Sequence, residues 1–238
     1  MRAVLLLAGI LSAAPLHAAH PLMTEDAGTQ GAGRWQLEGT SDREKHAGVA
    51  GREDNSAIVL TRGIAENLDA ILTVPWYRAG KDGIGDLGLD LKWRFFERGP
   101  LSFGLKPGVT APTGDDGKGR GTGRETFGAQ FIASWEPEGP LALHAHAGFR
   151  QNRNKQGERD ALTHFSAAAT YRVGDVRLVV DVARDTNPDP AASGGERYLV
   201  LGAMWSVRKD FDLDAGVKTG HGSATLDNAL LFGATVRW

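Results

Sequence analysis

Residues 85–96 read GDLGLDLKWRFF, and alternate residues of this stretch fall into two contrasting rows. The first row is apolar and comprises Leu87, Leu89, Leu91, Trp93 and Phe95. The second row is mainly charged and comprises Asp86, Asp90, Lys92 and Arg94. An extended strand produces such rows because successive side chains point to opposite faces. The stretch therefore predicts a strand with one apolar and one polar face.

The composition favours a β-rich chain and argues against several kinds of site. Of the 238 residues, 32 are glycine and none is cysteine. Because glycine destabilises helices, the alternation in this chain is better explained by an all-β fold with many turns. The net charge of −2 gives no electrostatic reason to expect a nucleic-acid partner. Without cysteine there is no disulfide, thiolate nucleophile or cysteine-based zinc site, and we expect no cofactor and no bound metal.

The N-terminus has the layout of a secretory signal peptide. Arg2 supplies a positive charge, residues 3–11 form an apolar run, and small residues follow as far as Ala18 and Ala19. The run is too short to span a membrane, and no later apolar run reaches 18 residues. We expect residues 1–19 to be removed after Ala18 or Ala19, so that the protein leaves the cytoplasm.

The two-row pattern recurs about a dozen times along the remaining chain. Clear examples are residues 34–42, 68–77, 101–111, 126–135 and 141–150, while 56–64 is the least regular segment. Short connections alternate with long polar ones. The short connections are Ala65–Asn67, Glu97–Pro100, Glu136–Pro140, Gly174–Asp175 and Arg208–Asp210; the long ones are 43–55, 78–83, 113–124, 151–160, 186–196 and 219–225. A meander of such strands places all short turns at one end.

This asymmetry is typical of outer-membrane barrels, which have short periplasmic turns and longer extracellular loops. A soluble β-sandwich could show the same alternation, with its apolar rows buried. Many apolar rows here, however, end in aromatic residues, as in the membrane-interface girdles of barrels. We therefore predict an antiparallel up-and-down transmembrane β-barrel of about twelve strands in residues 34–238, located in the outer membrane of a Gram-negative bacterium.

Three stretches resemble a known family. They are His20–Glu38 (HPLMTEDAGTQGAGRWQLE), Gly83–Glu97 (GIGDLGLDLKWRFFE) and Leu105–Gly123 (LKPGVTAPTGDDGKGRGTG). They are similar to a family of outer-membrane proteins named for a meta-pathway of phenol degradation, although Met23 and Glu25 stand where that family has an aliphatic residue and an Asp. The resemblance implies a barrel that acts as a passive channel or transporter. It implies no catalytic residues.

The last strand also fits an outer-membrane protein. We predict a single outward row in this strand, formed by Leu226, Leu230, Phe232, Ala234, Val236 and Trp238. A terminal alternating row that ends in an aromatic residue is similar to the signal recognised during barrel assembly. We expect the partners to be outer-membrane lipid, the barrel-assembly machinery through the strand ending in Trp238, and a small-molecule solute.

Polar rows facing inward would line a lumen. The residues that we predict to line it are Asp86, Asp90, Lys92, Arg94, Lys106, His144, His146, Arg150, His164 and Asp181. Charges of both signs occur in this set, so we expect weak ion selectivity or a partly closed lumen. Residues 20–33 are polar and form either a periplasmic segment or a plug in that lumen.

Two local patterns suggest other chemistry. The loop 113–125 is rich in glycine, but its spacing fits no phosphate-binding motif. If residues 141–150 and 161–173 pair symmetrically about Lys155, His146 lies opposite His164, and pairing about Gly174–Asp175 places Asp185 beside His164. Such a group could bind a metal or activate a hydroxyl, although a polar lumen explains it equally.

The sequence therefore favours a non-enzymatic channel for the passive uptake or efflux of small, including aromatic or hydrophobic, solutes. Two alternatives stay open: an outer-membrane hydrolase with a His-based site at the rim, and a structural barrel of the envelope. A hydrolase requires a base within hydrogen-bonding distance of a nucleophile, whereas a channel requires only a hydrated lumen.

Overall fold

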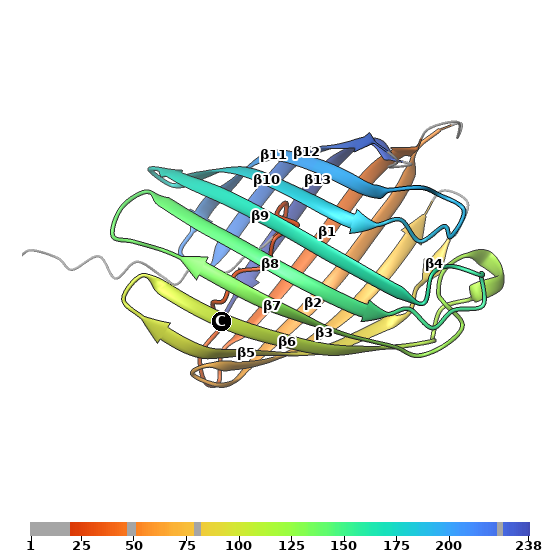
Figure 1. Cartoon of the computed structure of the whole chain (residues 1–238). Coiled ribbons are helices and arrows are strands. Elements are labelled where there is room, and N and C mark those ends of the chain that lie inside the picture. The colour runs from red at the N-terminus through yellow and green to blue at the C-terminus, as the bar shows by residue number, and fades with distance from the viewer. Residues whose placement is uncertain (1–19, 47–50, 79–81, 223–225) are drawn as a thin grey trace, which may run out of the picture.

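A computed structural model describes residues 20–46, 51–78, 82–222 and 226–238, so the expected signal peptide at 1–19 lies outside the described residues. The described chain forms a closed antiparallel β-barrel of twelve long strands, with a two-residue strand, β4, at one rim (Figure 1). The strands are β1 (Trp35–His46), β2 (Glu53–Ala65), β3 (Leu68–Arg78), β4 (Gly83–Ile84), β5 (Leu87–Arg98), β6 (Leu101–Ala111), β7 (Thr126–Trp135), β8 (Leu141–Gln151), β9 (Ala161–Val173), β10 (Val176–Thr186), β11 (Gly195–Arg208), β12 (Phe211–Gly222) and β13 (Leu226–Arg237). The barrel fold and strand number predicted from the sequence are confirmed.

The barrel closes where its first and last strands meet. Each long strand pairs with its neighbour in sequence, and β1 pairs with β13. At this seam Trp35 and Trp238 exchange backbone hydrogen bonds of 2.9 and 3.1 Å, and their rings stack with centroids 6.3 Å apart. Closure gives each long strand a partner on both sides, as a hydrocarbon environment requires.

The connections differ between the two ends of the barrel. β9 and β10 are joined only by Gly174 and Asp175, and Gly174 has a φ of 60°, which glycine adopts without strain. At the opposite end, the loop between β6 and β7 contains a single 3₁₀ turn, Asp116–Lys118. In the described part of the chain, no helix has the length and apolar character needed to cross a membrane.

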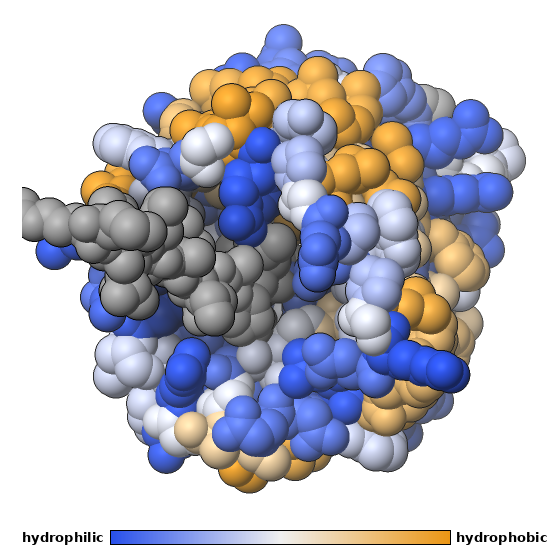
Figure 2. Space-filling model, turned by 90° about the vertical axis from the view of Figure 1, so that its left-hand side faces the viewer, coloured by the Kyte–Doolittle hydropathy of each residue, from blue (hydrophilic) through white to orange (hydrophobic). Residues whose placement is uncertain are grey.

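Apolar side chains cover the outside of the barrel, and polar side chains fill the inside. In β8, Leu143 and Phe149 are exposed, whereas His144 and His146 between them are buried. On the outer face, the rings of Phe95, Phe103 and Phe131 contact one another. Figure 2 shows the short-turn end of the barrel, with apolar residues in the outer wall and hydrophilic residues around the mouth. This distribution is the reverse of a soluble sandwich and fits an apolar surrounding medium.

One residue of the last strand departs from the predicted outward row. Leu226 is only 4% exposed and packs inside the barrel with Val200 and Leu231. The reason is a register shift: His46 pairs with Leu226 and Lys45 pairs with Asn228, which leaves an extra residue in β13. A bulge of this kind reverses the faces on either side of it. The prediction that Leu226 faces outward is therefore wrong.

Candidate functional site: the barrel interior

The N-terminal segment, defined here as residues 20–33, lies inside the barrel, from its middle to its short-turn end (Figure 1). It forms hydrogen bonds with strands all around the wall. His20 bonds to Asp42 of β1 at 2.8 Å and to Asp214 of β12 at 2.5 Å. The Gln30 backbone N–H donates to the Asp69 carboxylate of β3 at 3.0 Å. These contacts hold both ends of the segment against the inner wall.

Asp181 of β10 anchors the middle of the N-terminal segment. Its Oδ2 accepts the backbone N–H groups of Met23 and Thr24, each at 2.7 Å, and its Oδ1 accepts the Thr24 hydroxyl at 2.8 Å. Asp181 is fully buried. A carboxylate that accepts several hydrogen bonds is stabilised where water cannot reach it. Asp181 therefore replaces the solvent that these backbone groups would otherwise need.

Two inward lysines neutralise the acidic residues of the segment. Lys92 Nζ lies 2.9 Å from Glu25 and 3.2 Å from Asp26, and Lys106 Nζ lies 2.7 Å from the other oxygen of Glu25. Lys92 is only 5% exposed. Buried charges of this kind require partners, because desolvation of an unpaired ion costs several kcal/mol. The strand sequence and the N-terminal sequence thus complement each other in charge.

Two further wall side chains accept backbone N–H groups of the segment. His146 Nδ1 accepts from Glu25 at 2.8 Å, and the Ser134 hydroxyl accepts from Ala27 at 2.9 Å. Ser134 also lies 2.9 Å from His144 Nδ1. Because His146 accepts at Nδ1, its ring proton must be on Nε2. These bonds give the irregular backbone of the segment the partners that buried peptide groups need.

Beyond the N-terminal segment, toward the long loops, the lumen holds a cavity of about 620 Å³, here called the vestibule. Its wall includes four inward glycines, Gly88, Gly108, Gly128 and Gly148, which follow one another on β5, β6, β7 and β8. Because glycine has no side chain, each of these inward positions leaves space in the lumen next to the sheet. Met23 of the N-terminal segment also lines the vestibule. The segment and the glycines together set the depth and width of this cavity.

The histidines do not pair as predicted from the sequence. His146 lies opposite Ser166, and His164 lies opposite Gly148, so the expected pairing of His146 with His164 is wrong by two residues. The two rings nevertheless stack diagonally, with centroids 4.4 Å apart. Asp185 lies beside His164 as predicted, and its carboxylate bonds to His164 Nδ1.

The predicted lumen residues occupy different environments. Asp90, Lys106, His146, Arg150 and His164 line the vestibule, and Lys92, Lys106, His146 and Asp181 contact the N-terminal segment. His144 is buried next to Ser134. Two others lie at the rims: Asp86 accepts the backbone N–H groups of Gly114 and Thr122 in a long loop, and Arg94 pairs with Glu97 beside a short turn.

Sequence reasoning did not single out two wall residues that contact the N-terminal segment. Asp69 and Ser134 both make such contacts from buried positions. For Asp69 a signal existed, because it stands between the outward residues Leu68 and Ala70 in an otherwise apolar strand. For Ser134 no local pattern distinguishes a contact to the segment from an ordinary polar position.

One carboxyl oxygen at the short-turn end lacks a hydrogen bond. Glu136 directly follows β7, and its buried Oε1 has no hydrogen-bond partner among the described residues, although His144 Nε2 lies 3.9 Å away. Burial, together with the negative charge of Asp26, raises the pKa of Glu136 from its ordinary value of 4.5 to about 7, although Arg177 acts in the opposite direction. The carboxyl group therefore changes charge near neutral pH.

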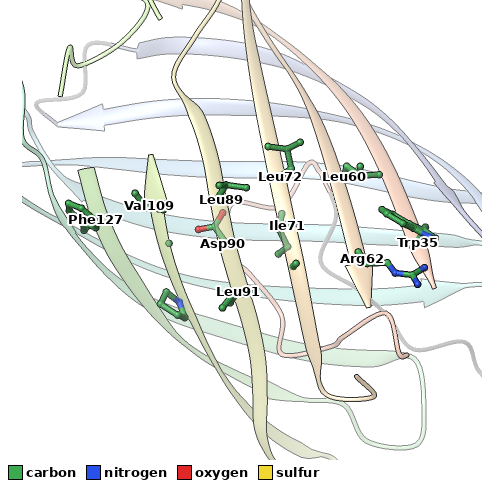
Figure 3. A pocket seen from close by; sticks show the side chains of 13 residues that line it. Trp35, Leu60, Arg62, Ile71, Leu72, Leu89, Asp90, Leu91, Val109 and Phe127 are labelled. Atoms are coloured by element: carbon green, nitrogen blue, oxygen red, sulfur yellow. The ribbon is translucent and has the colours of Figure 1, made fainter. Parts of the chain in front are cut away.

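A second hollow, of about 640 Å³, lies on the outer wall across β1 to β7 (Figure 3). Outward apolar residues such as Leu72, Leu89 and Phe127 line it, and Arg62 stands at its edge. The Arg62 guanidinium lies 4.6 Å from the centre of the Trp35 ring and donates to the carbonyl oxygen of Gly33 at 2.5 Å.

The interior provides little for other chemistry. Within the described ranges, no group of three or more His, Cys, Asp or Glu side chains is arranged to hold a metal ion. The interior contains ion pairs, hydrogen-bond acceptors and a cavity lined mainly by polar residues.

Comparison with known proteins agrees with this architecture. A family model described as "Putative MetA-pathway of phenol degradation" matches residues 21–238. An outer-membrane channel from Pseudomonas putida F1 superposes with a TM-score of 0.67 at 14% identity, covering 90% of this chain and 98% of that one. The NanC porin gives a TM-score of 0.62 at 9% identity, covering 85% and 98%. The KdgM porin in complex with disordered oligogalacturonate gives 0.61 at 7%, covering 84% and 98%. A search of curated protein sequences found no match.

Proposed function

This chain belongs to the family described for the MetA pathway of phenol degradation, and from that premise we propose that it conducts small solutes passively across the outer membrane of a Gram-negative bacterium. The observation that carries the proposal is the barrel itself, with an apolar exterior and a polar interior that holds a cavity of about 620 Å³. The solved structures with the same fold are outer-membrane porins and channels. The part of the polar lining that surrounds this cavity does not bind the N-terminal segment alone, and a polar lining of this kind suits a water-filled or solute-filled space.

We propose that the N-terminal segment is a plug that limits conduction. Its hydrogen bonds and ion pairs with Asp181, Lys92 and Lys106 fix it across the short-turn half of the lumen. Solute would then pass through the remaining space or after displacement of the segment. The family description supports small aromatic or hydrophobic compounds among the solutes, while the vestibule itself is polar.

The remaining expected partners belong to the same proposal. Outer-membrane lipid would cover the outward apolar rows, and the barrel-assembly machinery would recognise the last strand with Trp238. Export would depend on residues 1–19. We propose no nucleic-acid partner and no enzymatic activity for this barrel.

Conductance of the refolded chain in planar bilayers tests the channel and the plug together. We expect discrete openings of low conductance from the parent protein. In Asp181→Asn one carboxylate oxygen becomes an amide, so the backbone N–H groups of Met23 and Thr24 lose their charged acceptor. We expect this variant to show larger or more frequent openings.

Asp212→Asn is the matched control, because Asp212 also faces inward but pairs with Arg237 of β13 at 2.7 Å. We expect it to conduct like the parent. An insulating parent protein would contradict the channel proposal, and equal conductance of all three proteins would contradict the plug.

The structure also supplies an argument against the hydrolase alternative. Among the described residues, the shortest contact between a hydroxyl group and an imidazole is that of Ser134 with His144, at 2.9 Å. Ser134, however, is buried and already accepts the Ala27 N–H, so a substrate carbonyl has no approach to its oxygen. We expect the triple variant of His144, His146 and His164 to Gln to conduct, and no esterase activity in either form. Esterase activity of the parent that disappears in the variant would favour the enzyme instead.

A further inference from the structure

The vestibule contains a notch at Gly148, between two polar side chains. In the strand register Gln130 of β7, Gly148 of β8 and His164 of β9 lie side by side. Because neighbouring strands are about 4.8 Å apart, the Cα atoms of Gln130 and His164 are separated by roughly 10 Å. A Cβ at Gly148 would lie 3.4 Å from the Gln130 side chain and 3.6 Å from that of His164. The missing side chain at position 148 therefore leaves a gap that both residues border.

Each of these two side chains carries a buried polar atom without a hydrogen bond. Within the part of the chain that the structure describes, Gln130 Oε1 and His164 Nε2 have no hydrogen-bond partner. Both residues line the vestibule. An unsatisfied buried polar atom is unfavourable, so a bound group that satisfies two of them is favoured. The arrangement is that of a binding site rather than of a packed wall.

The hydrogen-bonding character of the notch follows from its neighbours. His164 Nδ1 bonds to the Asp185 carboxylate, which can only accept, so the ring proton is on Nδ1. In the neutral ring Nε2 is then an acceptor, as is Gln130 Oε1. Two acceptors on either side of a gap require a ligand that offers at least two N–H or O–H donors.

The charges around the notch favour a cation. Four carboxylates line the same vestibule, those of Asp90, Glu158, Asp185 and Glu196, whereas its cationic side chains are Lys106 and Arg150. Lys106 is already paired with Glu25 at 2.7 Å, which leaves an excess of negative charge. Hydrogen bonds from a charged donor are about twice as strong as neutral ones. An ammonium group combines several donors with the required charge.

We propose that the notch formed by Gln130, Gly148 and His164 binds the primary ammonium group of a small organic amine. One N–H donates to Gln130 Oε1, a second donates to His164 Nε2, and the carboxylates of the vestibule balance the charge. The inference rests on the proposed function only in that solutes must reach the vestibule. It adds a ligand class, small organic amines, to the solutes of the channel.

Calorimetric titration of the refolded barrel in detergent measures this binding without any need for conduction. The probes are n-butylammonium chloride and tetramethylammonium chloride at equal ionic strength. Both ions carry one positive charge, but tetramethylammonium has no N–H donor. We expect the parent protein to bind n-butylammonium at least about tenfold more tightly than tetramethylammonium.

Two variants remove the notch in different ways. Gly148→Val fills the gap, where the added Cβ makes only ordinary contacts, and Gln130→Leu removes one acceptor at similar volume. We expect both to lose the preference for n-butylammonium. Gly88→Ala is the control, because Gly88 lines the same vestibule but its Cβ would contact Thr73 at 3.4 Å instead. It should keep the preference. Heat-modifiable migration on gels establishes that each variant is folded.

The outcomes separate this inference from the channel proposal. Equal binding of the two probes by the parent, no binding of n-butylammonium, or a preference that survives both Gly148→Val and Gln130→Leu would overturn the notch as an amine site, even if the protein conducts. A selective site in a protein that does not conduct would support the notch and contradict the channel.

Discussion

The two halves of the lumen are built from the same strands, yet one is filled and the other is open. In the short-turn half, the inward positions carry residues such as Lys92, Ser134 and Asp181, which bond to the N-terminal segment. In the long-loop half, glycines occupy neighbouring inward positions on β5 to β8, and a cavity of about 620 Å³ remains. The alternation of strand residues decides only which face is inside.

What fills the inside is decided by complementarity. A polar segment can leave water only where each buried charge and backbone group finds a partner, and the short-turn half supplies such partners. The long-loop half offers glycines and an acceptor, Gln130 Oε1, that has no hydrogen-bond partner among the residues that the structure describes. A barrel interior can therefore be closed or opened by a few inward residues, with no change in strand number.

The largest effect should follow from the removal of a charge in the filled half. Lys92→Met leaves Asp26 and one oxygen of Glu25 buried without their cation. The loss of one partner of a buried ion pair costs about 3–5 kcal/mol. We expect a clearly lower heat-modification temperature and a higher conductance than in the parent.

Arg150→Met is the corresponding change in the open half. Arg150 lines the vestibule but is exposed, so its loss strands no buried charge. We expect a stability change of less than about 1 kcal/mol, as for exposed charges in general. Equal destabilisation by the two variants would remove the energetic distinction between the halves.

A bulky residue in the open half should reduce conduction with a smaller effect on stability. In Gly88→Phe the new Cβ makes an ordinary contact with Thr73 at 3.4 Å, and the ring extends into the vestibule. We expect lower single-channel conductance and a destabilisation of at most about 1–3 kcal/mol from crowding. Gly39→Phe provides the comparison. Gly39 lies on the outer face of β1, opposite to the face of the buried Gln36, and a Cβ at this position would have open space around it. It should conduct normally, and reduced conductance in both variants would indicate a general distortion of the barrel.

The fold could be predicted from the sequence because its signal is local and repeated. Alternating rows, short turns and long loops specify strands, faces and a meander without knowledge of any distant contact. The register of the hairpin between β8 and β9 could not be predicted in the same way. Asn152 bonds to Asp160 across the loop, and the Asn154 side chain accepts the N–H groups of Gln156 and Glu158. These bonds centre the hairpin on Gln156 instead of Lys155, which shifts His146 by two residues.

The contacts between the N-terminal segment and the barrel wall could not be predicted from the sequence for a different physical reason. Thr24 and Asp181 are 157 residues apart, and no local pattern relates them. The inward placement of Asp181 follows from alternation, but its partner depends on the path of an irregular segment. Likewise, the glycines at 88, 108, 128 and 148 are visible in the sequence, yet only the strand register places them on one wall of the same cavity.

The smallest effect we expect is a pH dependence at the filled end, and it concerns Glu136. Burial raises the pKa of this carboxyl group to about 7 from 4.5. The folded protein therefore binds more protons than the unfolded chain between about pH 4.5 and 7, so this group's contribution to stability falls as the pH rises through that window.

Glu136→Gln keeps the neutral form at every pH. Its heat-modification temperature should match that of the parent at pH 5 and exceed it slightly above pH 7. Glu138→Gln, a change at an exposed carboxyl group of the same turn, should follow the parent at both pH values. Parallel pH curves for the parent and Glu136→Gln would show that burial of this carboxyl group does not make stability depend on pH.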